Sequence, residues 1–84
     1  MLNIKVLGSG CANCNRLEKM VRNAVDQLGI EAQVEKITDP TKYLDYNVMS
    51  TPGLVINGKT FSSGRVPSLA EITSFVTTAE MESN

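Results

Sequence analysis

The sequence has no histidine and no tryptophan, and only two of its 84 residues are cysteines. Two cysteines do not build the disulfide framework of a small secreted domain, so an intracellular setting is expected. A structural zinc site usually takes four ligands, which argues against a closed mononuclear zinc site within this chain. Aromatic residues make up only 5% of the chain, and its net charge of −1 comes without a basic cluster. A nucleic-acid-binding surface is therefore not expected.

Long apolar runs are also missing from the sequence. No segment approaches the ~20 apolar residues that cross a bilayer, and the N-terminal apolar run of about seven residues is shorter than most signal-peptide cores. We therefore expect a cytoplasmic protein with no membrane contact. The composition, with 42% apolar and 20% charged residues, is typical of a globular chain. The length predicts a single domain over residues 1–84.

The periodicity of the apolar residues predicts the element order β-α-β-α-β-β-α. The expected strands cover residues 1–7, 30–37, 53–56 and 59–61. The first expected helix begins between residues 11 and 14 and ends at 28, the second covers roughly 40–46, and the last follows Ser68 as its cap, with 81–84 frayed. Apolar and polar residues alternate over 30–37, which indicates an outer strand. The initial β-α-β unit predicts two parallel strands, and the later hairpin adds antiparallel ones. We expect an α/β fold, a mixed four-stranded sheet with helices on both faces.

Short motifs mark where these elements begin and end. They are Gly29 as a left-handed helix cap, Asp39-Pro40 as a helix start, Asn57-Gly58 as a type I′ turn, Ser62–Arg65 as a connector, and Ser68 with Glu71 as a capping box. The helical spacing also predicts which side chains are buried. For the first helix these are Leu17, Met20, Val21, Ala24, Val25 and Leu28, and for the last helix Leu69, Ile72, Phe75 or Val76, and Ala79.

Both cysteines lie in Gly10-Cys11-Ala12-Asn13-Cys14, where the first strand gives way to the first helix. Free N–H groups and the positive end of the helix dipole favour a thiolate at this place. The two-residue separation lets the sulfurs approach bonding distance. Cys14 falls on the apolar face of the helix, so we expect Cys11 to attack a substrate disulfide and Cys14 to resolve the mixed disulfide. Binding of copper(I) by the two thiolates, and simple packing of two small side chains, are the other interpretations of the motif.

A second feature is Thr51-Pro52, directly before a predicted strand. The proline can simply start that strand, where its missing N–H does no harm. Alternatively, the peptide bond is cis and packs beside Cys11, which leaves neighbouring backbone groups free to pair with an extended substrate. The Cys-x-x-Cys motif at the end of the first strand favours the cis interpretation.

Gly10-Cys11-Ala12-Asn13-Cys14 and Ser50-Thr51-Pro52-Gly53, in a chain of this element order, resemble the thioredoxin superfamily. The small thioredoxin- or glutaredoxin-like redox-active disulfide proteins of archaea and bacteria are the most similar group. The resemblance runs from Leu2 to about Thr78, almost the whole chain, and includes Gly64-Arg65-Val66. It implies a thioredoxin-like fold whose site comprises the catalytic Cys11 and Cys14, with Gly10, Ala12, Asn13, Thr51, Pro52 and Gly64 around them. Within this site, Pro52 is the implied cis-proline and Thr51 offers backbone groups to the substrate.

The sequence also departs from the patterns of this superfamily. Thioredoxins have Trp before the motif and Gly-Pro within it, where this chain has Gly10 and Ala12-Asn13. Only Lys42 and Arg65 are candidates for holding glutathione, and a solvated surface charge is the expected role of each. Asp26 is expected on the polar face of its helix rather than beneath the cysteines. Core packing is the expected role of the remaining candidates, which are Tyr43, Tyr46, Phe61, Met20 and Met49.

We therefore expect a cytoplasmic thiol–disulfide oxidoreductase, a monomer without a bound cofactor. It would reduce disulfides of proteins or small molecules and be reduced in turn by a reductase or a dithiol donor. The main alternative is a soft-metal module that binds copper(I) through Cys11 and Cys14. Heavy-metal-associated domains have a similarly placed motif, but usually with Met-Thr before it and the order β-α-β-β-α-β. A third possibility is a redox-sensing domain whose disulfide alters partner binding without turnover.

Overall fold

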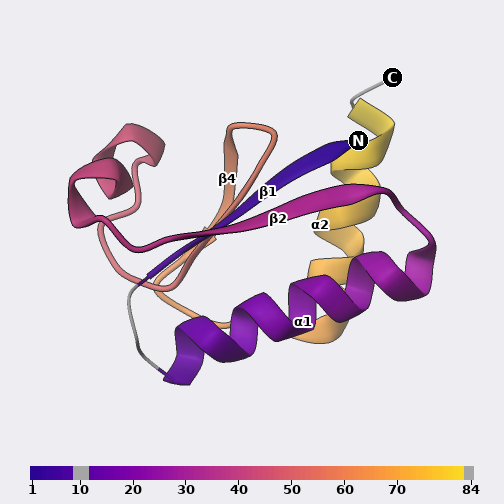
Figure 1. Ribbon diagram of the computed structural model, residues 1–84, viewed down its shortest axis with the longest axis horizontal. Helices are drawn as coiled ribbons and strands as arrows, with labels where there is room; N and C mark the ends of the chain where they lie inside the picture. Colours follow the sequence, from indigo (N-terminus) through magenta and orange to yellow (C-terminus); the bar gives the residue numbers. More distant parts are fainter. Residues whose placement is uncertain (9–11, 83–84) are drawn as a thin grey trace.

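A computed structural model describes residues 1–8 and 12–82 of the chain and shows the predicted order of elements (Figure 1). The strands are β1 (Leu2–Leu7), β2 (Ala32–Ile37), β3 (Gly53–Ile56) and β4 (Lys59–Ser63). The helices are α1 (Ala12–Leu28), the 3₁₀ helix η1 (Pro40–Tyr46) and α2 (Leu69–Glu82).

The four strands form one mixed sheet in the order β2-β1-β3-β4. β1 is parallel to β2 and antiparallel to β3, and β3 is antiparallel to β4. Ile4 of β1 is paired with Val34 on one side and with Ile56 on the other. The outer position of β2 confirms the prediction from its alternating pattern, since Gln33 and Glu35 are exposed. The structure thus confirms the predicted mixed four-stranded sheet.

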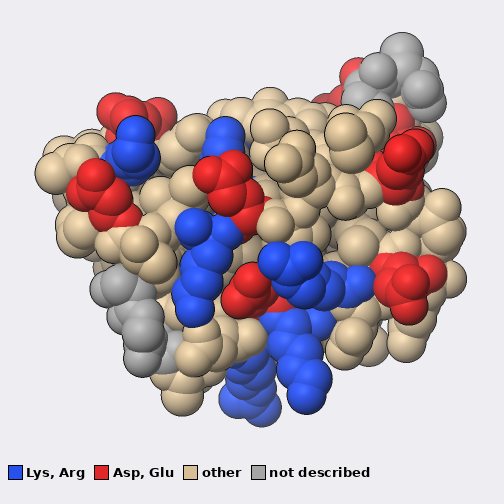
Figure 2. Space-filling model, viewed as in Figure 1, with Lys and Arg blue, Asp and Glu red and all other residues tan. Residues whose placement is uncertain are grey.

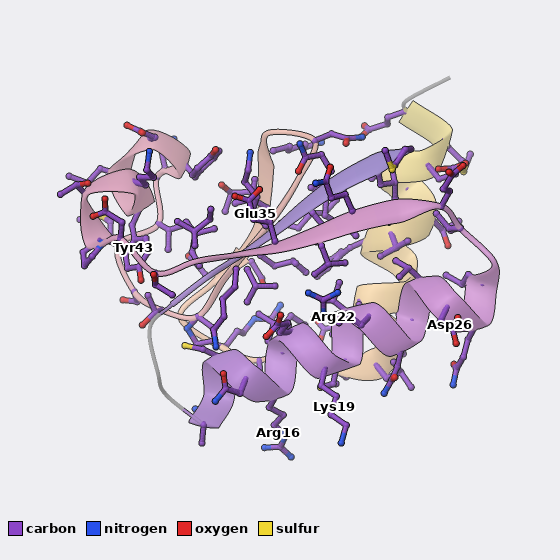
Figure 3. All side chains as sticks on the ribbon, viewed as in Figure 1. Arg16, Lys19, Arg22, Asp26, Glu35 and Tyr43 are labelled. Atoms are coloured by element: carbon purple, nitrogen blue, oxygen red, sulfur yellow. The ribbon has the colours of Figure 1, made fainter. Side chains whose placement is uncertain are left out.

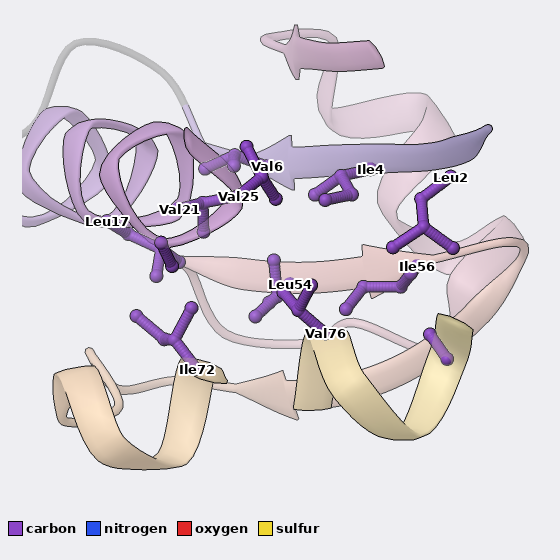
Figure 4. Packing of buried hydrophobic residues seen from close by; sticks show 12 residues of the cluster. Leu2, Ile4, Val6, Leu17, Val21, Val25, Leu54, Ile56, Ile72 and Val76 are labelled. Carbon is purple, nitrogen blue, oxygen red and sulfur yellow. The ribbon is translucent and has the colours of Figure 1, made fainter. Parts of the chain in front are cut away.

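The main hydrophobic core lies between the sheet and the two long helices (Figure 4). Alternate residues of β1 point into it, because successive side chains of a strand face opposite sides of the sheet. Its fully buried members include Leu2, Ile4 and Val6 of β1, Leu17 and Val21 of α1, Leu54 and Ile56 of β3, and Ile72 and Val76 of α2. α1 and α2 therefore cover the same face of the sheet.

A smaller cluster lies on the opposite face of the sheet. It consists of Leu7, Val48 and Val55, with Tyr43 and Tyr46 of η1 packed against it. Helical segments thus cover both faces, as predicted, but among the described elements the opposite face is covered only by the short η1, over one end.

The local motifs take the predicted conformations. Gly29 has φ +67°, and Asn57 and Gly58 have φ +52° and +82° in the β3–β4 turn. The Asp39 carboxylate accepts a hydrogen bond from the Thr41 N–H at 3.0 Å. In the capping box of α2, Ser68 Oγ accepts from the Glu71 N–H and Glu71 Oε1 accepts from the Ser68 N–H, both at 3.2 Å.

Several element boundaries differ from the prediction. β2 begins at Ala32 rather than at residue 30, and η1 is a 3₁₀ helix. β4 extends to Ser63, because Ser62 and Ser63 pair with Leu54 and Gly53 beyond an irregularity in the register. α2 continues to Glu82, where fraying was expected from residue 81.

The burial of two leucines was predicted wrongly. Leu28 is 41% exposed and Leu69 is 45% exposed. Leu28 is the last residue of α1 and Leu69 is the first residue of α2, so both lie at helix ends, where the helix face no longer meets the sheet. On α2, Val76 is the fully buried residue, and Phe75 packs at the edge of the core with its ring centroid 5.3 Å from that of Phe61.

Candidate active site

Cys14 lies in the first turn of α1 and its side chain is fully buried. It shares the helix face of Leu17 and Val21, which confirms the orientation expected from the helical spacing. Cys14 is disulfide-bonded, and the other cysteine of the sequence, Cys11, lies outside the described residues. The protein therefore holds this sulfur on the side of the helix that solvent does not reach.

The other predicted residues of the motif have a different environment. Ala12 and Asn13 precede Cys14 at the start of α1, and both are exposed. Gly10 lies outside the described residues together with Cys11. The exposed start of α1 and the buried Cys14 are thus separated by less than one helical turn.

Gly8 brings the end of β1 directly against Cys14. It is buried, and its N–H donates a hydrogen bond to the Ile37 carbonyl at 2.9 Å. A Cβ built on Gly8 would lie 2.2 Å from Cys14 Sγ and 3.6 Å from Thr51 Cβ, and φ of Gly8 is +153°. Cβ atoms essentially never approach another atom as closely as 2.2 Å, so this approach requires glycine. Gly8 was not predicted as a site residue, and the signal in the sequence was a glycine directly after an apolar strand.

Thr51 approaches Gly8 from the same side as Cys14 Sγ, because a Cβ built on Gly8 would contact both residues. The Thr51–Pro52 peptide bond is cis. Pro52 is buried, whereas Thr51 is exposed. Since Gly8 is close to both Cys14 and Thr51, the structure brings the Cys-x-x-Cys helix and the Thr-Pro segment together at the end of β1.

Gly64 joins the same region from the end of β4. Its N–H donates a hydrogen bond to the Pro52 carbonyl at 2.9 Å. Its φ is +79°, and a Cβ built on it would lie 3.2 Å from Ser50 Cβ. Four segments therefore meet at one end of the sheet: the end of β1, the first turn of α1, residues 50–52 and the turn after β4.

Most of the candidates that were expected to be packing residues do pack in the core. Tyr43 and Tyr46 belong to the cluster beneath η1, and Phe61 and Met20 pack against the main core. Met49 does not, because its side chain is 88% exposed, and its predicted burial is wrong.

The charged candidates lie at the surface. Asp26 and Lys42 are exposed, as expected. Arg65 forms an ion pair with Glu71, with 2.8 Å between Nη2 and Oε2. Hydrogen bonds from Arg65 and then from the Ser68 N–H hold the pKa of the Glu71 carboxyl below its usual value. This pair supports the start of α2.

Neither a cluster of metal-binding side chains nor a membrane-spanning helix occurs in the described residues. Over residues 1–8 and 12–82, no three Cys, Asp or Glu side chains are grouped so as to hold a metal ion. In the same residues, no helix combines the length and apolar character that crossing a membrane requires.

Comparison with known proteins identifies the relatives of this chain. A family model described as a thioredoxin domain matches residues 2–77. A protein named thioredoxin from Methanothermobacter thermautotrophicus is 44% identical over 72 residues, which cover 86% of this chain and 94% of that protein. A protein of the same name from Methanocaldococcus jannaschii is 36% identical over 72 residues, 86% of this chain and 83% of that protein. These similarities do not support the copper(I)-binding alternative. The chain belongs to the thioredoxin family and is a thiol–disulfide oxidoreductase.

Proposed function

We propose that Cys11 is the attacking thiol and Cys14 the resolving thiol of this oxidoreductase. The complete burial of Cys14 is the observation that carries the proposal. A disulfide of another molecule cannot reach a sulfur covered by the protein. We therefore assign the attack to Cys11, three positions earlier in the sequence. Cys14 is therefore suited to the second, intramolecular step.

In the first step the Cys11 thiolate attacks one sulfur of the substrate disulfide. The substrate S–S bond breaks, a mixed disulfide forms with Cys11, and the other substrate sulfur leaves as a thiolate that takes up a proton. Cys14, after losing its proton, then attacks Cys11, which releases the second substrate thiol. Two electrons pass from the Cys11–Cys14 dithiol to the substrate, and the protein is left with a Cys11–Cys14 disulfide.

The substrate surface that we propose lies around Thr51. Thr51 is exposed, and Gly8 places it near Cys14. An extended segment that carries the disulfide would pair with backbone groups of Thr51, as a strand added to an edge does. Pro52 and Gly64 support this segment through their hydrogen bond. Gly10, Ala12 and Asn13 would shape the approach to Cys11.

We further propose that the protein acts as a reductant in the cytoplasm, where thiols are kept reduced. Its substrates would be disulfides of proteins or small molecules, and a reductase or a dithiol donor would restore the dithiol. The two electrons of the exchange come from a dithiol and go to a disulfide, so no other electron carrier is needed. Both cysteines that react belong to one motif. A monomer with a single domain over residues 1–84 therefore suffices.

Reduction of insulin disulfides, with dithiothreitol as the electron donor, tests the proposal. Cys11→Ser is expected to reduce the rate to that of dithiothreitol alone. Ser74→Ala, on the exposed side of α2, is the matched control and should keep the wild-type rate. An unchanged rate for Cys11→Ser would overturn the proposal.

A further inference from the structure

Basic side chains gather beside the first turns of α1. Arg16 and Lys19 are exposed, and in Figure 3 both point away from the sheet into solvent. Lys36 of β2 reaches the same end of the helix, where its Nζ donates a hydrogen bond to Asn15 Oδ1. In Figure 2, several basic side chains gather over the part of the molecule where Figure 1 draws α1. We call Arg16, Lys19 and Lys36 the basic patch.

The basic patch lies next to the candidate active site. Asn15, which binds Lys36, directly follows Cys14, and Arg16 follows Asn15. The patch thus begins within one turn of α1 from the buried sulfur. A molecule whose disulfide met the start of α1 would have its neighbouring groups beside these three cations.

Within the described residues, the acidic groups near the basic patch form no ion pair with it. Glu18 is paired with Arg22 at 3.0 Å, which compensates that arginine instead. Glu35 adjoins Lys36 in sequence but points to the other face of β2, since strand side chains alternate (Figure 3). Among residues 1–8 and 12–82, no carboxylate forms an ion pair with a member of the patch. Asp26 lies at the far end of α1.

The patch also contrasts with the chain as a whole. The net charge is −1, from eight basic and nine acidic residues, so the remainder of the molecule is acidic once these three cations are set aside. Fixed charges of one sign beside a reactive site raise the encounter rate of oppositely charged molecules and lower that of like-charged ones. The distribution of charge therefore favours substrates that carry negative charge near their disulfide.

We propose that the basic patch selects disulfides that are flanked by acidic residues. The inference rests on the proposed function, because it concerns the substrates of the same Cys11–Cys14 site. The attraction raises the rate at which protein and acidic substrate meet, so it raises kcat/KM for that substrate. It weakens as added salt shortens the Debye length.

Three synthetic peptides with the same disulfide-bonded loop test the proposal, flanked by aspartates, serines or lysines. Each kcat/KM is divided by the rate at which dithiothreitol, which attacks as a thiolate but carries no basic patch, reduces the same peptide. This division removes the effect of the flanking charges on the reactivity of the disulfide itself. We expect the normalised value for the aspartate peptide to exceed that for the lysine peptide by about tenfold at 0.01 M salt. The ratio should approach one at 1 M salt, where the Debye length is about 3 Å.

A variant that carries Arg16→Gln, Lys19→Gln and Lys36→Gln together should bring the low-salt ratio of the aspartate to the lysine peptide close to one. Glutamine at position 36 keeps a hydrogen-bond donor for Asn15. Lys59→Gln is the matched control, because Lys59 pairs with Glu82 at 3.6 Å at the start of β4, away from the Gly8 end of the sheet. It should keep the wild-type ratio.

The outcomes separate this inference from the function on which it rests. Equal normalised values for the three wild-type peptides at low salt would overturn the selection of acidic substrates and leave the proposed exchange intact. If the wild-type protein reduces none of the peptides faster than Cys11→Ser does, the proposed function fails and this inference fails with it. The wild-type comparison across peptides and salt needs no substituted protein, so the test does not depend on how the triple variant folds.

Discussion

The backbone of Gly8 lies against the sulfur of Cys14, so closely that a Cβ at position 8 would be 2.2 Å from Sγ. The same Cβ would be 3.6 Å from Cβ of Thr51. Gly8 is thus the point where the end of β1 meets both the Cys-x-x-Cys helix and the Thr-Pro segment. Gly8 is one of the residues that contact the buried side chain of Cys14.

Gly8→Ala is expected to destabilise the protein by about 3 kcal/mol or more, because the methyl group and Cys14 Sγ cannot both keep their positions. Gly29→Ala is the control. Gly29 also has a positive φ, but no atom lies within 4 Å of the added Cβ, so only the conformational cost of about 1–2 kcal/mol applies. Urea unfolding of the reduced proteins measures both values. Equal losses of stability in the two variants would contradict the close contact.

Gly64→Ala should impair the reaction more than Gly58→Ala does. The two glycines have nearly the same φ, +79° and +82°, so the conformational cost of about 1–2 kcal/mol is shared. Only at Gly64 does the new Cβ crowd another atom, Ser50 Cβ at 3.2 Å, and only there is the hydrogen bond to Pro52 disturbed. We expect kcat/KM for insulin to fall by about tenfold in Gly64→Ala and to change little in Gly58→Ala, since small displacements at a site are costly. Similar activities would argue that Gly64 has only a structural role.

Two leucines that the helical pattern treats alike should respond differently to truncation. Leu17 is fully buried beneath α1, whereas Leu69 is 45% exposed. Leu17→Ala should cost about 2–5 kcal/mol through loss of apolar contacts and the cavity that remains. Leu69→Ala should cost less than about 1 kcal/mol, as surface substitutions usually do. Chemical unfolding distinguishes these values, and a large loss for Leu69→Ala would show that this side chain is buried after all.

The capping box of α2 gives a pH dependence of known sign. Hydrogen bonds from Arg65 and from the Ser68 N–H lower the pKa of Glu71 below its ordinary value of 4.5. The folded state therefore prefers the ionised carboxylate, and this stabilisation is fully present above the ordinary pKa. It is lost as the pH falls through the lower pKa of the folded state. The difference in Tm between the wild-type protein and Glu71→Gln should thus be greatest at neutral pH and disappear in acid.

Glu31→Gln serves as the control for that measurement. Glu31 is exposed in the segment between α1 and β2, and its side chain forms no ion pair within residues 1–8 and 12–82. Its Tm difference from the wild-type protein should change less with pH than that of Glu71→Gln. A pH-independent difference for Glu71→Gln would contradict the role of its charge at the helix start.

Interactions within a few residues were predictable from the sequence. The Asn57-Gly58 turn and the Ser68–Glu71 capping box each depend on groups at most three residues apart, so tertiary structure is not needed to recognise them. The burial of Cys14 was also predictable, because its helix face is apolar along its length. The exposure of Leu28, Leu69 and Met49 was not, since it depends on where a helix or loop stops contacting the sheet.

The assembly of the candidate site depends on contacts that a local pattern does not contain. Gly8 meets Cys14 and Thr51 only after β1, α1 and the segment before β3 have packed together. In the sequence it is one of six glycines, and its position after a strand is a weak signal. The hydrogen bond between Gly64 and Pro52 likewise joins two loops through the pairing of β3 with β4. Such contacts become visible only in the folded structure, whereas the motif residues were recognisable from the sequence.

The most direct test of the central claim is to trap the mixed disulfide and identify its cysteine. Reduced Cys14→Ser and reduced Cys11→Ser are each mixed with the serine-flanked disulfide peptide, and the products are measured by mass spectrometry. We predict that Cys14→Ser accumulates a one-to-one adduct through Cys11, which dithiothreitol removes, because the resolving thiol is absent. Cys11→Ser should form almost none, because Cys14 is buried. An adduct that forms on Cys14 in Cys11→Ser, and not on Cys11 in Cys14→Ser, would contradict the account.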